Sequence, residues 1–151
     1  MKITKNRSEK GFTLVEIIIV LAIIGLIMAL VGPRLIEQFD KSKSVTAKAQ
    51  AKSIESAVIS MQIDIGRYPT NAEGLTLLHK PSADIVESWQ GPYLSSDLPK
   101  DPWGRPYIYR EPESEGLRPA IGTLGSDGVQ GGTGAAKDIF IGDNSNAPKP
   151  S

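Results

Sequence analysis

The sequence predicts an α+β fold in which one long N-terminal helix packs on a small antiparallel sheet. Three observations predict it. An apolar run of bilayer length lies near the N-terminus, and an apolar stripe at intervals of three and four residues continues it. Beyond Gly91, short apolar segments alternate with turn residues and lead into a C-terminal loop rich in glycine and aspartate. With 151 residues, the chain has room for one small domain beside this helix.

The first part of the predicted helix has the length of a membrane span. Residues 12–32 hold a single charged side chain, that of Glu16. At about 1.5 Å rise per residue they cover roughly 30 Å, the thickness of the bilayer hydrocarbon. The residues before the run are mainly basic, so the positive-inside tendency predicts a cytoplasmic N-terminus and an exported C-terminal domain.

Glu16 makes this span unusual. A charged side chain at the centre of a membrane helix costs roughly 2.5 to 3.5 kcal/mol on insertion scales, so a carboxylate in such a run usually has a partner. Residues 30–34 lack the small-residue pattern of an ordinary secretory cleavage site. An uncleaved signal anchor is the alternative interpretation, but it leaves Glu16 without a purpose.

Residues 33–65 are predicted to extend the helix as an amphipathic segment. Pro33 lacks an amide hydrogen, so we expect the helix to loosen there and then continue. Gly66 is expected to end it as a C-cap. The lysines between residues 41 and 52 fall largely off the apolar stripe and are interpreted as a solvated surface rather than a lipid-binding face. The stripe itself consists of Ile36, Phe39, Ala47, Ala51, Ile54, Val58, Met61 and Ile65.

Residues 66–151 are predicted to form the small globular domain. Thr70 and Glu73 have the spacing of a capping box, so a short helix should begin near Thr70. Brief strands are expected at residues 92–94, 106–109, 120–124 and 138–141.

Charge and composition exclude several classes of function. The chain has zero net charge as written and a small negative charge without its basic leader, so nucleic acid is not an expected partner. It has no cysteine and one histidine, which leaves little from which to build a zinc site or a nucleophile with a base. No G-x-S-x-G elbow is present either. A membrane-anchored hydrolase is therefore a weak alternative, and no enzymatic activity is expected.

The loop at residues 124–139 is the second informative stretch. Its glycines allow backbone carbonyls to turn inward, and the carboxylates of Asp127 and Asp138 could close on a hard cation such as calcium. Acidic glycine-rich loops without a metal are also common, so spacing alone leaves the question open.

The segment Gly-Phe-Thr-Leu-Val-Glu at residues 11–16 resembles the class III leader of type IV pilins and pseudopilins. The resemblance implies that a prepilin peptidase removes residues 1–11 by cutting after Gly11 and methylates the new N-terminal residue, Phe12. The ammonium group of Phe12 and the carboxylate of Glu16 on a neighbouring chain are then suitable partners during assembly, because a buried charge needs a counter-charge.

An ordered series of motifs resembles the major pseudopilins of type II secretion, the general secretion pathway protein G family. This resemblance implies a pilin-like fold and a structural role. The subunit would polymerise from the bacterial inner membrane into a periplasmic pseudopilus that helps drive folded proteins through the outer-membrane secretin. Expected partners are copies of the chain itself, minor pseudopilins, the prepilin peptidase and the inner-membrane assembly platform. Besides residues 11–16, the motifs lie at residues 66–70, 73–75, 101–104 and 124–128.

The same resemblance implies a calcium site in the C-terminal loop. Its ligands would be the carbonyls of Leu124 and Val129 and the carboxylates of Asp127 and Asp138. Family members usually place a further acidic residue just before the position of Asp138, where this chain has Ala136 and Lys137. Fewer carboxylates and an added ammonium should weaken the site, and Lys137 could replace the ion by bridging to Asp127.

Two related classes remain as alternatives. A type IV pilin commonly pins its C-terminal loop with a disulfide, which a chain without cysteine cannot form. A minor pseudopilin often lacks the glutamate that this chain keeps as Glu16.

Overall fold

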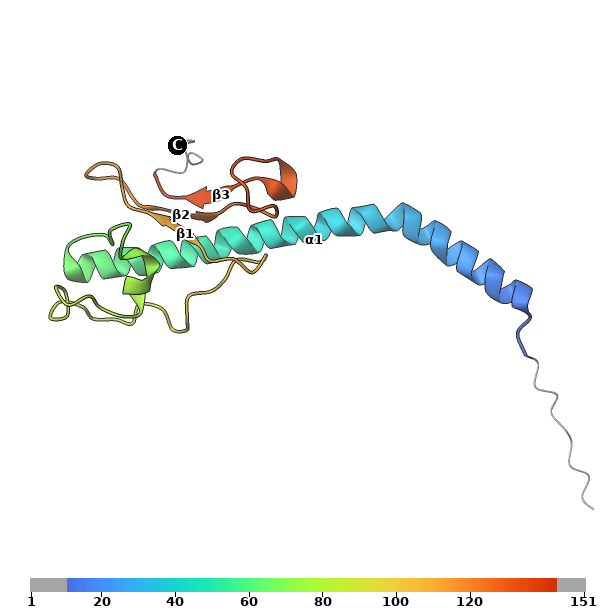
Figure 1. The fold of residues 1–151 in the computed structure, drawn as a ribbon, viewed down its shortest axis with the longest axis horizontal. Coiled ribbons are helices and arrows are strands. Elements are labelled where there is room, and N and C mark those ends of the chain that lie inside the picture. The colour runs from blue at the N-terminus through green and yellow to red at the C-terminus, as the bar shows by residue number, and fades with distance from the viewer. Residues whose placement is uncertain (1–10, 144–151) are drawn as a thin grey trace, which may run out of the picture. The chain divides into compact units, whose positions relative to one another are not determined.

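The computed structural model describes residues 11–143 and confirms a long helix packed on a small antiparallel sheet (Figure 1). The predicted leader, apart from Gly11, lies outside the described residues, as do residues 144–151. In chain order the elements are helix α1 (Leu14–Ile65), 3-10 helix η1 (Gly74–Leu78), strand β1 (Ile108–Arg110), strand β2 (Ala120–Thr123), 3-10 helix η2 (Gly134–Ala136) and strand β3 (Ile139–Ile141).

The chain divides into two compact units, one ending at Gln38 and the other beginning at Phe39. By length and composition, α1 is long and apolar enough to cross a membrane. Its most apolar stretch is not buried by the described residues, and Leu26 of the first unit, for example, is 74% exposed. This part of α1 therefore carries an apolar surface that residues 11–143 do not cover.

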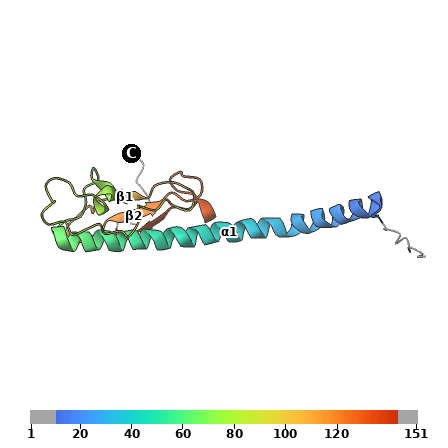
Figure 2. The ribbon, with the colours of Figure 1, turned by 90° about the horizontal axis from the view of Figure 1, so that it is seen from below.

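In the second unit, the sheet lies along one side of α1 (Figure 1, Figure 2). Its strands run antiparallel in the order β1-β2-β3, with Ile121 of β2 paired to Tyr109 on one side and Ile141 on the other. Ile121 and the apolar side chains of α1 form the core together with η1. The fully buried members of the helix stripe are Ala47, Ala51, Ile54, Val58 and Met61.

The predicted stripe is wrong at its N-terminal end. Ile36 and Phe39 have the correct spacing, but they are 64% and 67% exposed. The described residues leave both side chains exposed, and the first buried residue of α1 is Ala47. At the other end Gly66 has a φ of +79°, and its N–H donates to the Gln62 carbonyl at 2.8 Å, as expected of a glycine C-cap.

The predicted strand at residues 92–94 does not form. The N–H of Tyr93 donates to the carbonyl of Leu78 at 2.9 Å, which ties this segment to η1 instead of the sheet. The ring of Tyr93 packs edge-on against Trp89, with 5.6 Å between the ring centroids. Tyr93, an aromatic residue typical of strands, therefore packs within a loop and stabilises it.

Glu73 holds the turn that leads into η1. Its carboxylate accepts hydrogen bonds from the Thr70 N–H at 2.8 Å and the Thr70 hydroxyl at 3.0 Å, which confirms the predicted capping box. The helix that follows is 3-10 in type. Arg67 binds the same carboxylate through two nitrogens at 2.7 and 2.8 Å. The Arg67 hydrogen bonds, together with those from Thr70, lower the pKa of Glu73 to about 2.

This network predicts an acid-sensitive contribution to stability. The folded-state pKa of Glu73 lies below its ordinary value of about 4.3, so its contribution is complete above that pH and is lost as the pH falls toward 2. We expect Glu73→Gln to cost about 1 to 2 kcal/mol at pH 7 and little near pH 2, because charge-assisted hydrogen bonds contribute on this scale. The free energy of unfolding is measured by urea denaturation of the detergent-solubilised chain, monitored by circular dichroism. The exposed Glu113→Gln is the control, and an equal cost at both pH values would contradict the prediction.

Candidate functional site

The N-terminus of α1 forms the first candidate site. The carboxylate of Glu16 accepts hydrogen bonds from the N–H and the hydroxyl of Thr13, at 2.8 and 3.0 Å. In return the N–H of Glu16 donates to the Thr13 hydroxyl at 3.2 Å. This is a complete capping box, which satisfies N–H groups that lack partners in the first turn of a helix. Within a single chain, the charge of Glu16 is therefore compensated by its own helix end.

Sequence reasoning missed this box, although its signal was readable. Thr13 and Glu16 have the same spacing as Thr70 and Glu73, which were recognised as a cap.

Gly11 and Phe12 lie immediately before α1, outside any regular element. The side chain of Phe12 is 83% exposed. Both residues of the predicted cleavage site thus lie in backbone that the described part of the chain does not cover, three and two residues before the first residue of the helix.

The second candidate site is the loop between β2 and β3, which is folded largely by its own backbone. The N–H of Ser126 donates to the carbonyl of Ala135 at 2.9 Å, closing the two sides of the loop. Gly125 has a φ of +66°, and a Cβ there would lie 2.5 Å from the carbonyl oxygen of Ala136. A glycine is required at this position because any side chain would force the two sides apart.

Each predicted ligand carboxylate binds a backbone N–H of the loop. Asp127 accepts from Val129 at 3.0 Å through Oδ1, and Asp138 accepts from Gly131 at 3.0 Å through Oδ2. The second oxygen of Asp138, Oδ1, is buried and has no hydrogen-bond partner among the described residues. A buried acceptor without a donor is a position at which a cation can bind favourably.

Arg105 contributes a positive charge from outside the loop. Its guanidinium donates to the carbonyl of Gly125 and lies over the ring of Trp103, 5.9 Å from the centroid. The predicted bridge from Lys137 to Asp127 is absent from the described residues, where Lys137 is exposed and forms no ion pair. Nothing in the local sequence connects Arg105 to Gly125, because the contact depends on how the turn before β1 meets the loop.

Asp101 fixes the turn from which Arg105 extends. It is 4% exposed, and its Oδ1 accepts from the N–H groups of Trp103 and Arg105 at 3.0 and 2.8 Å. Its Oδ2 accepts from the hydroxyl of Thr123, the last residue of β2. Burial favours the neutral acid, but these hydrogen bonds outweigh it and hold the pKa of Asp101 below its ordinary value. The Asp-Pro-Trp-Gly turn therefore positions the start of the loop.

The loop residues offer the type of ligand atom that calcium prefers but little negative charge. The predicted ligands are all oxygens, which calcium prefers, and the orphaned Oδ1 of Asp138 is one of them. Within residues 11–143, however, no three or more histidine, cysteine, aspartate or glutamate side chains gather into a group that could hold a metal. The guanidinium of Arg105 beside Gly125 further reduces the negative potential of the loop.

The first part of α1 has the length of a membrane span and carries a capped carboxylate in its first turn. The later part of the same helix packs against a three-stranded antiparallel sheet. These features together define a pilin-like protein. A family model described as type II secretion system (T2SS), protein G matches residues 34–142. A second model, the prokaryotic N-terminal methylation motif, matches residues 6–32. The chain belongs to the type II secretion system protein G family.

Individual relatives agree with this family. Type II secretion system core protein G of Pseudomonas aeruginosa is 36% identical, over 93% of this chain and 99% of the relative. The protein of the same name from Vibrio cholerae is also 36% identical, over 89% of this chain and 92% of the relative.

A solved structure is similar as well. It is the crystal structure of the major pseudopilin from the type 2 secretion system of enterohaemorrhagic Escherichia coli, with a TM-score of 0.55 and 28% identity, covering 74% of this chain and 94% of that one. The comparisons confirm the predicted pseudopilin class and fold. They favour neither a type IV pilin nor a minor pseudopilin.

Proposed function

We propose that this chain is the main building block of a type II secretion pseudopilus, polymerising from the inner membrane to help drive folded proteins through the outer-membrane secretin. The observation that carries the proposal is the apolar length of α1, which none of the residues 11–143 buries. Such a surface suits both a bilayer before assembly and a bundle of identical helices after it. Family membership supports the system to which it belongs.

The proposed topology follows from the order of the segments. Residues 1–11 form a cytoplasmic leader, residues 12–32 cross the inner membrane, residues 33–65 extend the helix, and residues 66–151 form the periplasmic domain. The match of the methylation motif to residues 6–32 supports this assignment. Minor pseudopilins, the prepilin peptidase and the inner-membrane assembly platform are the proposed partners.

Processing is proposed to create the charge that Glu16 meets. Cleavage after Gly11 and methylation of Phe12 produce a cationic N-terminus four residues before Glu16, the last residue of the Thr13–Glu16 box. In the isolated subunit the box compensates the carboxylate. On assembly, the ammonium of Phe12 on a neighbouring chain takes over this role and sets the register between subunits.

The β2–β3 loop is proposed as a weak calcium site. The carbonyls of Leu124 and Val129 and the carboxylates of Asp127 and Asp138 are its ligands, and the buried Oδ1 of Asp138 is the observation that supports it. Ala136 and Lys137 leave the site with little negative charge, so modest affinity is expected. The family is one of structural pseudopilins, and we assign no catalytic residues to this chain.

Intact mass spectrometry of protein extracted from membranes tests the processing. The expected mass is that of residues 12–151 with one added methyl group, because the peptidase both cuts and methylates. Protein from a host without the peptidase is the control and should keep the leader. Full-length protein that starts at Met1 in a host with an active peptidase would contradict the proposal.

Replacement of Glu16 tests the charge pairing. We expect Glu16→Ala to insert into the membrane normally but to reduce sheared filaments about tenfold or more, the effect of losing an interaction of about 1.4 kcal/mol. Glu16→Gln is the matched variant, because glutamine can still complete a capping box but carries no charge. If charge matters, both variants should fail alike. Filament yields equal to those of the wild type in the glutamine variant would show that the cap alone is sufficient.

Thermal unfolding tests the calcium site. Calcium should raise the melting temperature of the detergent-solubilised chain, since a ligand that binds only the folded form stabilises it, by about 2.7 kcal/mol at a hundredfold excess over Kd. Asp138→Asn should remove the effect, and magnesium at the same concentration is the ion control. Coincident melting curves with calcium and with a chelator would indicate a loop that works without metal.

A further inference from the structure

One exposed face of α1 in the second unit carries a row of lysines. Lys41, Lys48 and Lys52 are separated by seven and four residues, so they lie on one face of the helix. All three are exposed, and none of them forms an ion pair with another described residue. Val45 lies between them on the same face and is 64% exposed. We refer to these four residues as the lysine stripe.

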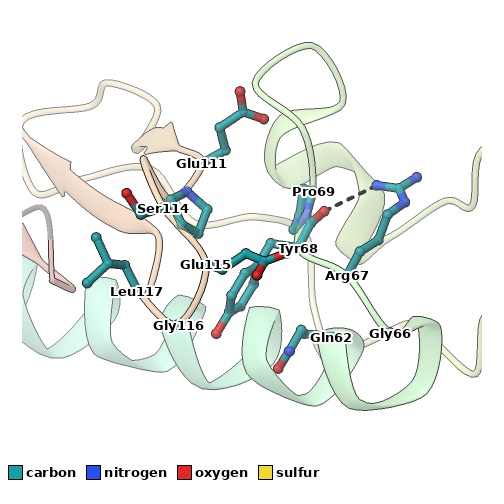
Figure 3. A pocket seen from close by; sticks show the side chains of 11 residues that line it. Gln62, Gly66, Arg67, Tyr68, Pro69, Glu111, Ser114, Glu115, Gly116 and Leu117 are labelled. Atoms are coloured by element: carbon teal, nitrogen blue, oxygen red, sulfur yellow. Dashed lines mark hydrogen bonds between the residues drawn. The ribbon is translucent and has the colours of Figure 1, made fainter.

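The hairpin loop between β1 and β2 carries the opposite charge. Glu111, Glu113 and Glu115 are exposed, and no ion pair joins them to another side chain within residues 11–143. Glu111 and Glu115 lie at the edge of an open hollow of about 390 Å³, beside Gln62 near the C-terminal end of α1 (Figure 3). We refer to residues 111–116 as the acidic loop.

Within one copy, the acidic loop does not reach the lysine stripe. The loop borders the hollow that Gln62 lines. At about 1.5 Å per residue, Gln62 lies about 15 Å along the helix from Lys52 and about 31 Å from Lys41. Figure 1 and Figure 2 both show the loop at the C-terminal end of α1. The lysine stripe and the acidic loop are therefore exposed at different positions along the axis of α1.

We propose that the lysine stripe of one copy binds the acidic loop of a neighbouring copy in the polymer, an inference that rests on the proposed function. The two copies are displaced along the helix axis by roughly the separation of the two surfaces, about 15 to 31 Å. Different patches meet in this contact, so it does not close on itself and each copy can bind another above and below. Opposite charges provide the recognition.

A membrane surface is the other possible partner for a row of lysines. Anionic headgroups would attract the lysine stripe but would leave the three glutamates of the acidic loop without a partner. A second copy uses both surfaces at once. We therefore assign the stripe to contact between copies.

Disulfide cross-linking tests the contact directly, because the chain has no cysteine of its own. In full-length chain carrying Lys48→Cys and Glu113→Cys, oxidation of the assembled polymer should give a ladder of covalent dimers and higher species. The matched control pairs Lys43→Cys with Glu113→Cys. Lys43 is an exposed lysine of the same helix, but its spacing from Lys41 places it off the stripe. Equal cross-linking of both pairs would overturn the proposal.

Charge reversal provides an independent test. Lys48→Glu with Lys52→Glu, or Glu113→Lys with Glu115→Lys, should each lower the yield of sheared filaments several-fold without changing the melting temperature. The four substitutions combined should restore most of the yield. Filaments that form equally well in both reversed variants would overturn this proposal while leaving the proposed function intact. Loss of binding to anionic vesicles in the lysine variant, without rescue of filaments by the combined variant, would overturn it in favour of lipid. A wild-type chain that forms no filaments would overturn both proposals.

Discussion

The rest of the structure depends on the division of α1 into a covered and an uncovered part. From Ala47 to Met61 the sheet and η1 bury one face of the helix completely, and this contact gives the small domain its core. Before that point the apolar side chains of α1 are left uncovered by the part of the chain that the structure describes. One end of α1 is buried by its own domain, whereas the other end needs a bilayer or other helices to remove its apolar side chains from water. An isolated monomer in water cannot bury both ends.

Most of this division could be predicted from the sequence, because a continuous apolar run and a periodic stripe are local patterns. Ile36 and Phe39 fit the stripe and are nevertheless exposed, since spacing does not reveal where the covering domain ends. The strand expected at residues 92–94 failed for a related reason, since Tyr93 packs on Trp89 instead of joining the sheet. Secondary-structure propensity is a property of a local segment, whereas the structure that the segment adopts also depends on residues far away in the chain.

The candidate sites show the same limit. The spacing of Thr13 and Glu16 is a readable signal for a capping box, whereas no local pattern indicates the contact of Arg105 with Gly125. The two boxes of this chain also show how one motif serves two purposes. At Thr70 and Glu73 it is reinforced by Arg67 and fixes a turn, whereas at Thr13 and Glu16 no cation accompanies it among the described residues. The carboxylate of Glu16 is therefore the one that remains available to a cation from another chain.

The position of Arg105 has a consequence for the conditions in which the subunit can work. A guanidinium is permanently charged and covalently attached, so the carbonyl of Gly125 keeps a positive partner whatever the composition of the medium. A loop that relied on a dissolved ion alone would loosen whenever that ion became scarce. With its own tethered cation, this chain holds the start of its C-terminal loop through a contact that needs no dissolved ion.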